Sequence, residues 1–123
     1  MTVKELYDSI GGNYTGALEL FMNEKIVLKF ALKFKNDKSF QMLEAALAKK
    51  DWHEAFVAAH TLKGVAGNIS FTKMHKAAAA LTEQLRPEKE IDNMDLFNAL
   101  KACYNDTIAK LNQFEMIQWL KLV

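Results

Sequence analysis

The chain has 123 residues, a net charge of +1 and hydrophobic residues at half of its positions. This length suits one domain, and the balance of 16 basic against 15 acidic residues argues against nucleic acid as the main partner. No apolar run is long enough to span a membrane and no signal peptide is evident, so we expect a cytoplasmic protein without a membrane segment. The single cysteine, Cys103, excludes an internal disulfide and is predicted to be a buried thiol.

The hydrophobic spacing is helical from one end of the chain to the other, and Pro87 is the only proline. In chain order, we expect helices at 3–9, 14–21, 24–35, 37–49, 52–68, 71–86 and 93–120. Four longer helices with short turns predict an all-α fold: an antiparallel four-helix bundle with short additional N-terminal helices that cover one end. We expect a single domain over 1–123, with the short helices at about 1–22 and the bundle at about 23–120.

The most informative segment is the second half of the helix expected at 52–68. His60 lies at the edge of its inward apolar stripe, and Gly64 and Gly67 follow by four and seven residues, which puts them on the same face as the histidine. A glycine inside a helix costs about 1 kcal/mol relative to alanine. Two such residues beside one histidine indicate that something large approaches the ring.

Several chemistries for this histidine can be excluded. A metal ion needs three or four donors that converge at about 2 Å, and His53 lies two helical turns from His60, so we expect no metal and no other cofactor. The chain has no hydrolase nucleophile motif and no glycine-rich phosphate loop, so it has no visible means of using ATP and is not expected to be an enzyme.

The remaining hypothesis is that His60 is itself a nucleophile. A neutral imidazole can attack an electrophilic phosphorus through a ring nitrogen. Lys63, one turn on, is placed to neutralise phosphoryl charge, and Gly64 would allow a phosphoryl donor to come close to the ring.

Residues 60–68, with the sequence HTLKGVAGN, resemble the signature of histidine-containing phosphotransfer (HPt) domains of multistep two-component signalling. The similarity extends over residues 12–85. The resemblance implies an antiparallel four-helix bundle that accepts a phosphoryl group from a receiver-domain aspartate and passes it to another receiver domain. The implied partners are receiver domains of response regulators or hybrid histidine kinases. They supply the Mg²⁺, and the HPt protein has no kinase activity and is expected to be a monomer.

Carried onto this chain, the resemblance makes His60 the phosphoacceptor, Lys63 its charge partner and Gly64 the clearance residue. Many family members also place a glutamine on the following helix, hydrogen-bonded to the histidine ring. This chain has Thr82 at the equivalent spacing and Gln84 two residues on, so these two are the candidates for that support.

We also expect a docking surface for the partner beside His60. Its candidates are Val57 and Gly67 on the histidine helix, with Phe21 and Met22 from the short N-terminal helices, although Phe21 and Met22 can equally be core residues.

The remaining histidine, His75, is expected to be a solvated side chain.

Two other classes of function stay open. One is an HPt-like scaffold that binds a partner without phosphotransfer. The other is an unrelated helical adaptor whose glycines merely allow close helix packing. Phosphate incorporation at His60 would distinguish the phosphorelay function from both of these alternatives.

Overall fold

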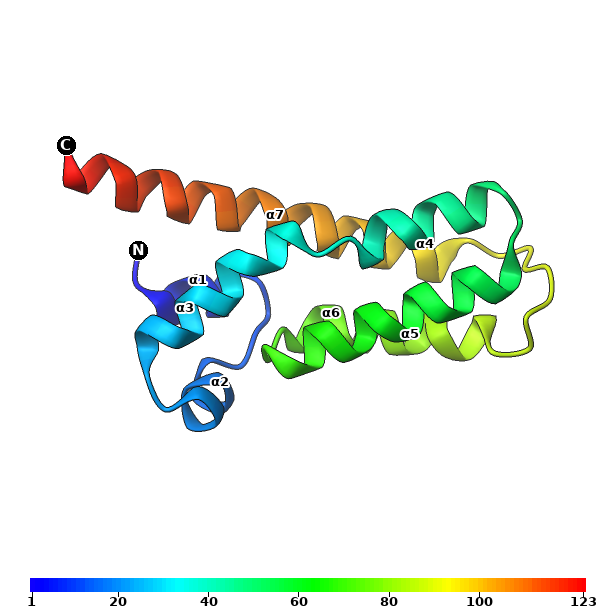
Figure 1. Ribbon diagram of the computed structural model, residues 1–123, viewed down its shortest axis with the longest axis horizontal. Coiled ribbons are helices and arrows are strands. Elements are labelled where there is room, and N and C mark those ends of the chain that lie inside the picture. Colours follow the sequence, from blue (N-terminus) through cyan, green and yellow to red (C-terminus); the bar gives the residue numbers. More distant parts are fainter.

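In the computed structural model, which describes residues 1–123, every regular element is a helix (Figure 1). The elements are α1 (Val3–Ser9), α2 (Tyr14–Phe21), α3 (Glu24–Lys33), the 3₁₀ turn η1 (Phe34–Asn36), α4 (Ser39–Ala48), α5 (Trp52–Asn68), α6 (Thr72–Leu85) and α7 (Asp95–Leu122). Each predicted helix is present, with ends that differ from the expected ones by no more than two residues. The prediction of an all-α helical bundle is confirmed.

Helices α4 to α7 form the bundle, in which α5 lies between α4 and α6. Tight turns at 49–51 and 69–71 reverse the chain before and after α5 (Figure 1). Lys50 and Ser70 take positive φ values of 57° and 59° in these turns. The side chain of Asp51 then caps α5 by accepting a hydrogen bond of 3.1 Å from the backbone N–H of Glu54.

Aromatic packing joins the first and last helices of the bundle. The ring of Phe40 on α4 stacks on Tyr104 of α7 with centroids 4.1 Å apart, and Gln41 donates a hydrogen bond of 2.9 Å to the Tyr104 hydroxyl. An ion pair of 2.9 Å between Lys101 and Glu44 lies nearby on the surface. These contacts hold α4 against α7.

The N-terminal helices cover one end of the bundle, as predicted (Figure 1). The Tyr7 hydroxyl of α1 donates a hydrogen bond of 2.9 Å to the carbonyl of Ile69, and the Asn13 N–H donates one of 2.8 Å to the carbonyl of Ser70. Both carbonyls belong to the α5–α6 turn, so α1 and α2 are fastened to that end. The opposite end, at the α4–α5 turn, is left uncovered by these helices.

Small residues bring α5 close to its neighbours. Its fully buried residues are Ala55, Ala59, Leu62 and Ala66, and Ala58 is nearly so. Because alanine side chains are short, helices α4 and α6 can pack tightly on either side of α5. Cys103 of α7 is a buried free thiol, as predicted. None of the helices combines the length and apolar character needed to cross a bilayer.

Candidate functional site

His60 stands at the midpoint of α5, on its exposed side. It differs from the other two histidines in its contacts. The ring of His53 is paired with the Glu88 carboxylate, and the ring of His75 is bonded to the backbone carbonyl of Lys63, whereas His60 has no hydrogen-bond partner within the chain. Both nitrogens of the His60 ring therefore remain available for reaction with an incoming group.

An aromatic ring and a cation support one side of the site. The ring of Phe56, one turn earlier on α5, stacks against His60 with centroids 6.0 Å apart and planes 20° apart. The guanidinium of Arg86, at the end of α6, lies over the same Phe56 ring at 5.3 Å from its centroid. This arrangement is a cation–π contact, and it holds a positive charge on the Phe56 side of the histidine.

Lys63, three residues after His60 on α5, brings a second cation. Its side chain is half-buried and takes part in none of the ion pairs in the structure. The carboxylate of Glu83 accepts hydrogen bonds of 2.8 and 3.0 Å from the first cation, Arg86. These bonds, and the charges of Arg86 and Lys63, hold the pKa of the Glu83 carboxyl below its usual range.

Gly64 leaves open space next to His60. A Cβ added at this position would meet no atom within 4 Å, and the residue is exposed. Nothing in the fold of the chain itself requires a glycine here. This agrees with the expectation that the bare backbone at Gly64 is left for something outside the chain.

Gly67 has a different environment, which corrects the sequence interpretation. A Cβ here would lie 2.9 Å from Nδ1 of His75, and that same nitrogen donates a hydrogen bond of 2.8 Å to the carbonyl of Lys63. The glycine therefore makes room for a side chain of α6. His75 is half-buried in this contact, so the expectation that it is a solvated side chain is wrong.

The structure does not bring Thr82 or Gln84 to the histidine ring. Thr82 is fully buried, and its hydroxyl donates a hydrogen bond of 2.7 Å to the carbonyl of Ala78 on its own helix. Gln84 donates to the carbonyl of Asn93, 3.0 Å away, and its buried side-chain oxygen has no partner. The expectation that one of them supports the ring is wrong for this structure. The Thr82 side chain lies in the core, and the Gln84 side chain contacts the loop that precedes α7.

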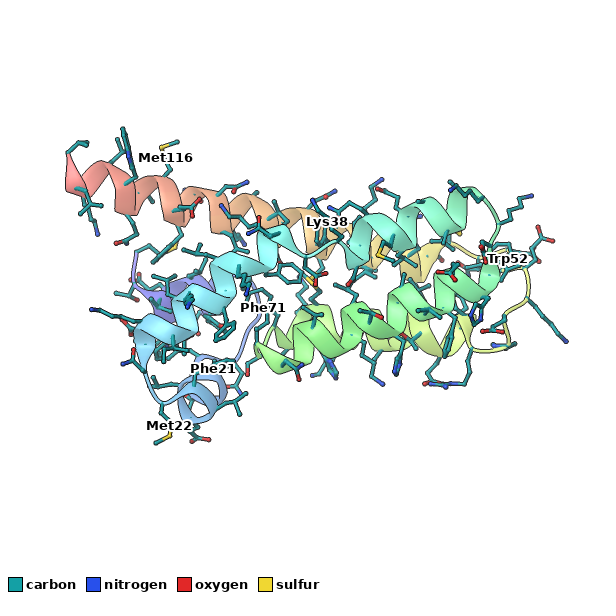
Figure 2. The ribbon with its side chains drawn as sticks, viewed as in Figure 1. Phe21, Met22, Lys38, Trp52, Phe71 and Met116 are labelled. Carbon is teal, nitrogen blue, oxygen red and sulfur yellow. The ribbon has the colours of Figure 1, made fainter.

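The four docking candidates fall in separate places. Val57 is 37% exposed on α5, and Gly67 is taken up by the contact with His75. Met22 is 86% exposed at the end of α2, and Phe21 is half-buried there. Figure 2 shows both α2 residues at the end of the molecule opposite the start of α5.

Phe21 is nevertheless linked to α5 through apolar side chains. Its ring stacks on Phe30 of α3 with centroids 5.0 Å apart. Phe30 and Val65 of α5 line the same surface cavity of about 340 Å³. An apolar strip defined by Phe21, Phe30 and Val65 thus reaches the residue that follows Gly64.

Three residues of the site were not predicted from the sequence: Phe56, Arg86 and Glu83. The spacing of four residues between Phe56 and His60 was a usable signal for the ring contact, because such residues are neighbours on a helix. Arg86 and Glu83 carry no such signal, since their approach depends on how α6 packs against α5. Together these groups give an exposed imidazole with free nitrogens, a lysine one turn on, an arginine on the stacked Phe56 ring and open backbone at Gly64.

Comparison with known proteins agrees with this geometry. A family model described as the Hpt domain matches residues 34–110, which is more than half of the chain and includes His60, Lys63 and Gly64. Neither the comparison with curated proteins nor that with solved structures gave a significant match. Hpt domains have a phosphotransfer role in two-component signalling and interact with receiver domains. The chain therefore belongs to the Hpt domain family.

Proposed function

We propose that this protein accepts a phosphoryl group on His60 from the aspartate of one receiver domain and passes it to the aspartate of another. The observation that carries the proposal is the state of the histidine: His60 is exposed at the midpoint of α5 and is the one histidine without a hydrogen-bond partner. An imidazole in that state is free to act as a nucleophile near neutral pH.

The transfer balances without any further reactant. The lone pair of a neutral ring nitrogen attacks the phosphorus of the aspartyl phosphate, and the P–O bond to the aspartate breaks with its electron pair on the carboxylate. The second ring nitrogen of His60 holds the imidazole proton or releases it to water. In the onward step the N–P bond breaks and its electron pair returns to the ring nitrogen. Mg²⁺ is expected on the receiver domain, and we expect no cofactor in this chain.

The groups around the ring suit an incoming phosphoryl group. Lys63, three residues after His60, and Arg86, on the Phe56 ring that stacks against His60, would supply two positive charges for an anion that carries about two negative charges near neutral pH. The open backbone at Gly64 allows the receiver to approach without meeting a side chain. Lys63 is expected to matter for the rate and for the lifetime of the phosphorylated state, because it supplies charge but no covalent chemistry.

We infer that the receiver docks over Val57, Gly64 and the apolar strip of Phe21, Phe30 and Val65. These residues lie on both sides of His60 and give apolar area with charged residues around it, the usual composition of a protein interface. Met22, which is almost fully exposed beside Phe21, would extend that area. The proposal includes a monomeric, cytoplasmic carrier without kinase activity.

The test is to follow labelled phosphate from a phosphorylated receiver domain in the presence of Mg²⁺. The wild-type protein should become labelled, whereas ATP alone should give no label. His60→Gln should remove all labelling, and His53→Gln and His75→Gln serve as matched controls that keep it. Self-labelling from ATP, or label retained by His60→Gln, would contradict the proposal. Binding of receivers without label would instead indicate an HPt-like scaffold.

A further inference from the structure

The packing of α5 against α6 places one acidic residue opposite the phosphoacceptor. Near the end of α5, Gly67 touches His75 of α6, and near its start the Phe56 ring lies under the guanidinium of Arg86, the residue that ends α6. These two contacts fix how the antiparallel helices are aligned. The residues of α6 that lie opposite the midpoint of α5 are therefore 81–82.

His60 is that midpoint of α5. Both residues opposite it are fully buried, so they do not reach the exposed side where the histidine stands. The next residue, Glu83, is exposed. Glu83 is thus the one acidic residue of α6, and it lies one position beyond the residues opposite His60.

Glu83 is ion-paired with Arg86 and is influenced by the charge of Lys63. It accepts two hydrogen bonds from Arg86, at 2.8 and 3.0 Å, and Arg86 rests on the Phe56 ring that stacks against His60. Lys63, three residues after the histidine on α5, is close enough for its charge to act on Glu83. In the resting protein one carboxylate therefore offsets part of the charge of two cations.

Building on the phosphotransfer proposed above, we propose that Glu83 is a positioning residue that competes with the phosphoryl group for Arg86 and Lys63. When His60 is phosphorylated, about two negative charges are added beside this carboxylate. Like charges repel, and the hydrogen bonds of Arg86 must then be shared between two anions.

The competition raises the free energy of the phosphorylated state relative to the resting state. Breaking the N–P bond, with its electron pair returning to the ring and the phosphoryl group leaving for a receiver carboxylate, restores the resting ion pair of Glu83 and Arg86. The consequence is a shift of the transfer equilibrium toward the receiver. Glu83 in this way favours release of the phosphoryl group, while the two cations favour its retention.

The test compares Glu83→Gln with Glu90→Gln. Glu90 is an exposed carboxylate that pairs with Lys50 at 3.7 Å, so both variants lose one negative charge but only one loses it at the site. The measurement is the equilibrium ratio of phosphorylated protein to phosphorylated receiver, from labelled phosphate, at low and at high salt. Loading with phosphoramidate, which needs no receiver, gives a second readout of phosphohistidine formation.

We expect Glu83→Gln to shift the ratio toward the phosphorylated protein by about threefold at low salt, the size of a surface charge interaction, and by less at high salt. Glu90→Gln should leave the ratio at the wild-type value. An unchanged ratio in Glu83→Gln, or a shift toward the receiver, would show that the carboxylate does not compete and would overturn the inference. If neither receiver nor phosphoramidate labels the wild-type protein, the proposed function itself fails, which is a separate result.

Discussion

Gly64 and Gly67 lie one turn apart on the same helix, yet their surroundings are opposite. A Cβ at Gly64 would meet nothing within 4 Å, whereas a Cβ at Gly67 would lie 2.9 Å from Nδ1 of His75. The first glycine leaves space on the outside of the molecule, and the second leaves space that α6 already fills. A glycine inside a helix can therefore indicate either an external partner or a close internal contact.

The surroundings of the two glycines thus distinguish two parts of α5, which we call its open side and its closed side. The open side holds His60 and Gly64, and no side chain of the protein bonds to the ring or covers the glycine. The closed side holds Gly67, where His75 is hydrogen-bonded to the Lys63 carbonyl at 2.8 Å. The idea that glycines merely allow close helix packing is right for Gly67 and does not explain Gly64.

The largest expected effect distinguishes His60, on the open side of α5, from His75, the α6 residue that packs on its closed side. His60→Gln should abolish phosphate acceptance and change the free energy of unfolding by less than about 1 kcal/mol, because an exposed side chain without a hydrogen bond contributes little to folding. His75→Gln should keep acceptance and lose about 1 kcal/mol of stability with its hydrogen bond. Labelling assays measure phosphate acceptance by both variants, and chemical denaturation measures their free energies of unfolding. Loss of labelling in both would show that the two sides are not independent.

A second large effect should follow from filling the open side. Gly64→Gln puts a long side chain where we expect the receiver to approach, so transfer from a phosphorylated receiver should be blocked. The fold should persist, because no atom of the chain occupies that space. Transfer rates and thermal melts on the same sample check this. Wild-type rates would mean that the partner does not pass over this glycine.

Alanine substitutions should change stability in opposite directions. Gly64→Ala should raise the free energy of unfolding by up to about 1 kcal/mol, since alanine is the better helix former. Gly67→Ala should lower it by about 1 kcal/mol or more, because His75 must shift away from the new methyl group and from the Lys63 carbonyl. Denaturant unfolding of both variants decides the sign. If His75→Ala is added to Gly67→Ala, the penalty should shrink, as expected for residues in contact.

The smallest effect concerns the start of α5, where His53 pairs with Glu88. The hydrogen bond and charge of Glu88 raise the pKa of His53 above 6.5 in the folded protein. A raised folded-state pKa gives stability that is fully present below the unfolded value and is lost as the pH rises through the folded value. Wild type should therefore melt above Glu88→Gln at pH values below 6.5, with a difference that disappears at higher pH. A difference that grows with pH would contradict this pairing.

The amino-acid sequence by itself determined the helices, the buried thiol of Cys103 and the face on which His60 lies. Helical spacing and chain breaks are local, and residues four apart in one helix are neighbours whatever the rest of the fold does. For that reason the helix ends agree to within two residues, and the open surroundings of Gly64 follow the expectation.

Only the tertiary structure decided which residues of α6 face the histidine helix. Arg86 reaches the Phe56 ring that stacks against His60 and binds Glu83, while Thr82 turns into the core and His75 reaches back to the Lys63 carbonyl. These outcomes depend on how far α6 is rotated and shifted against α5. That rotation is set by how the side chains of all four bundle helices fill the core together, and the spacing of residues within a single helix does not contain this information.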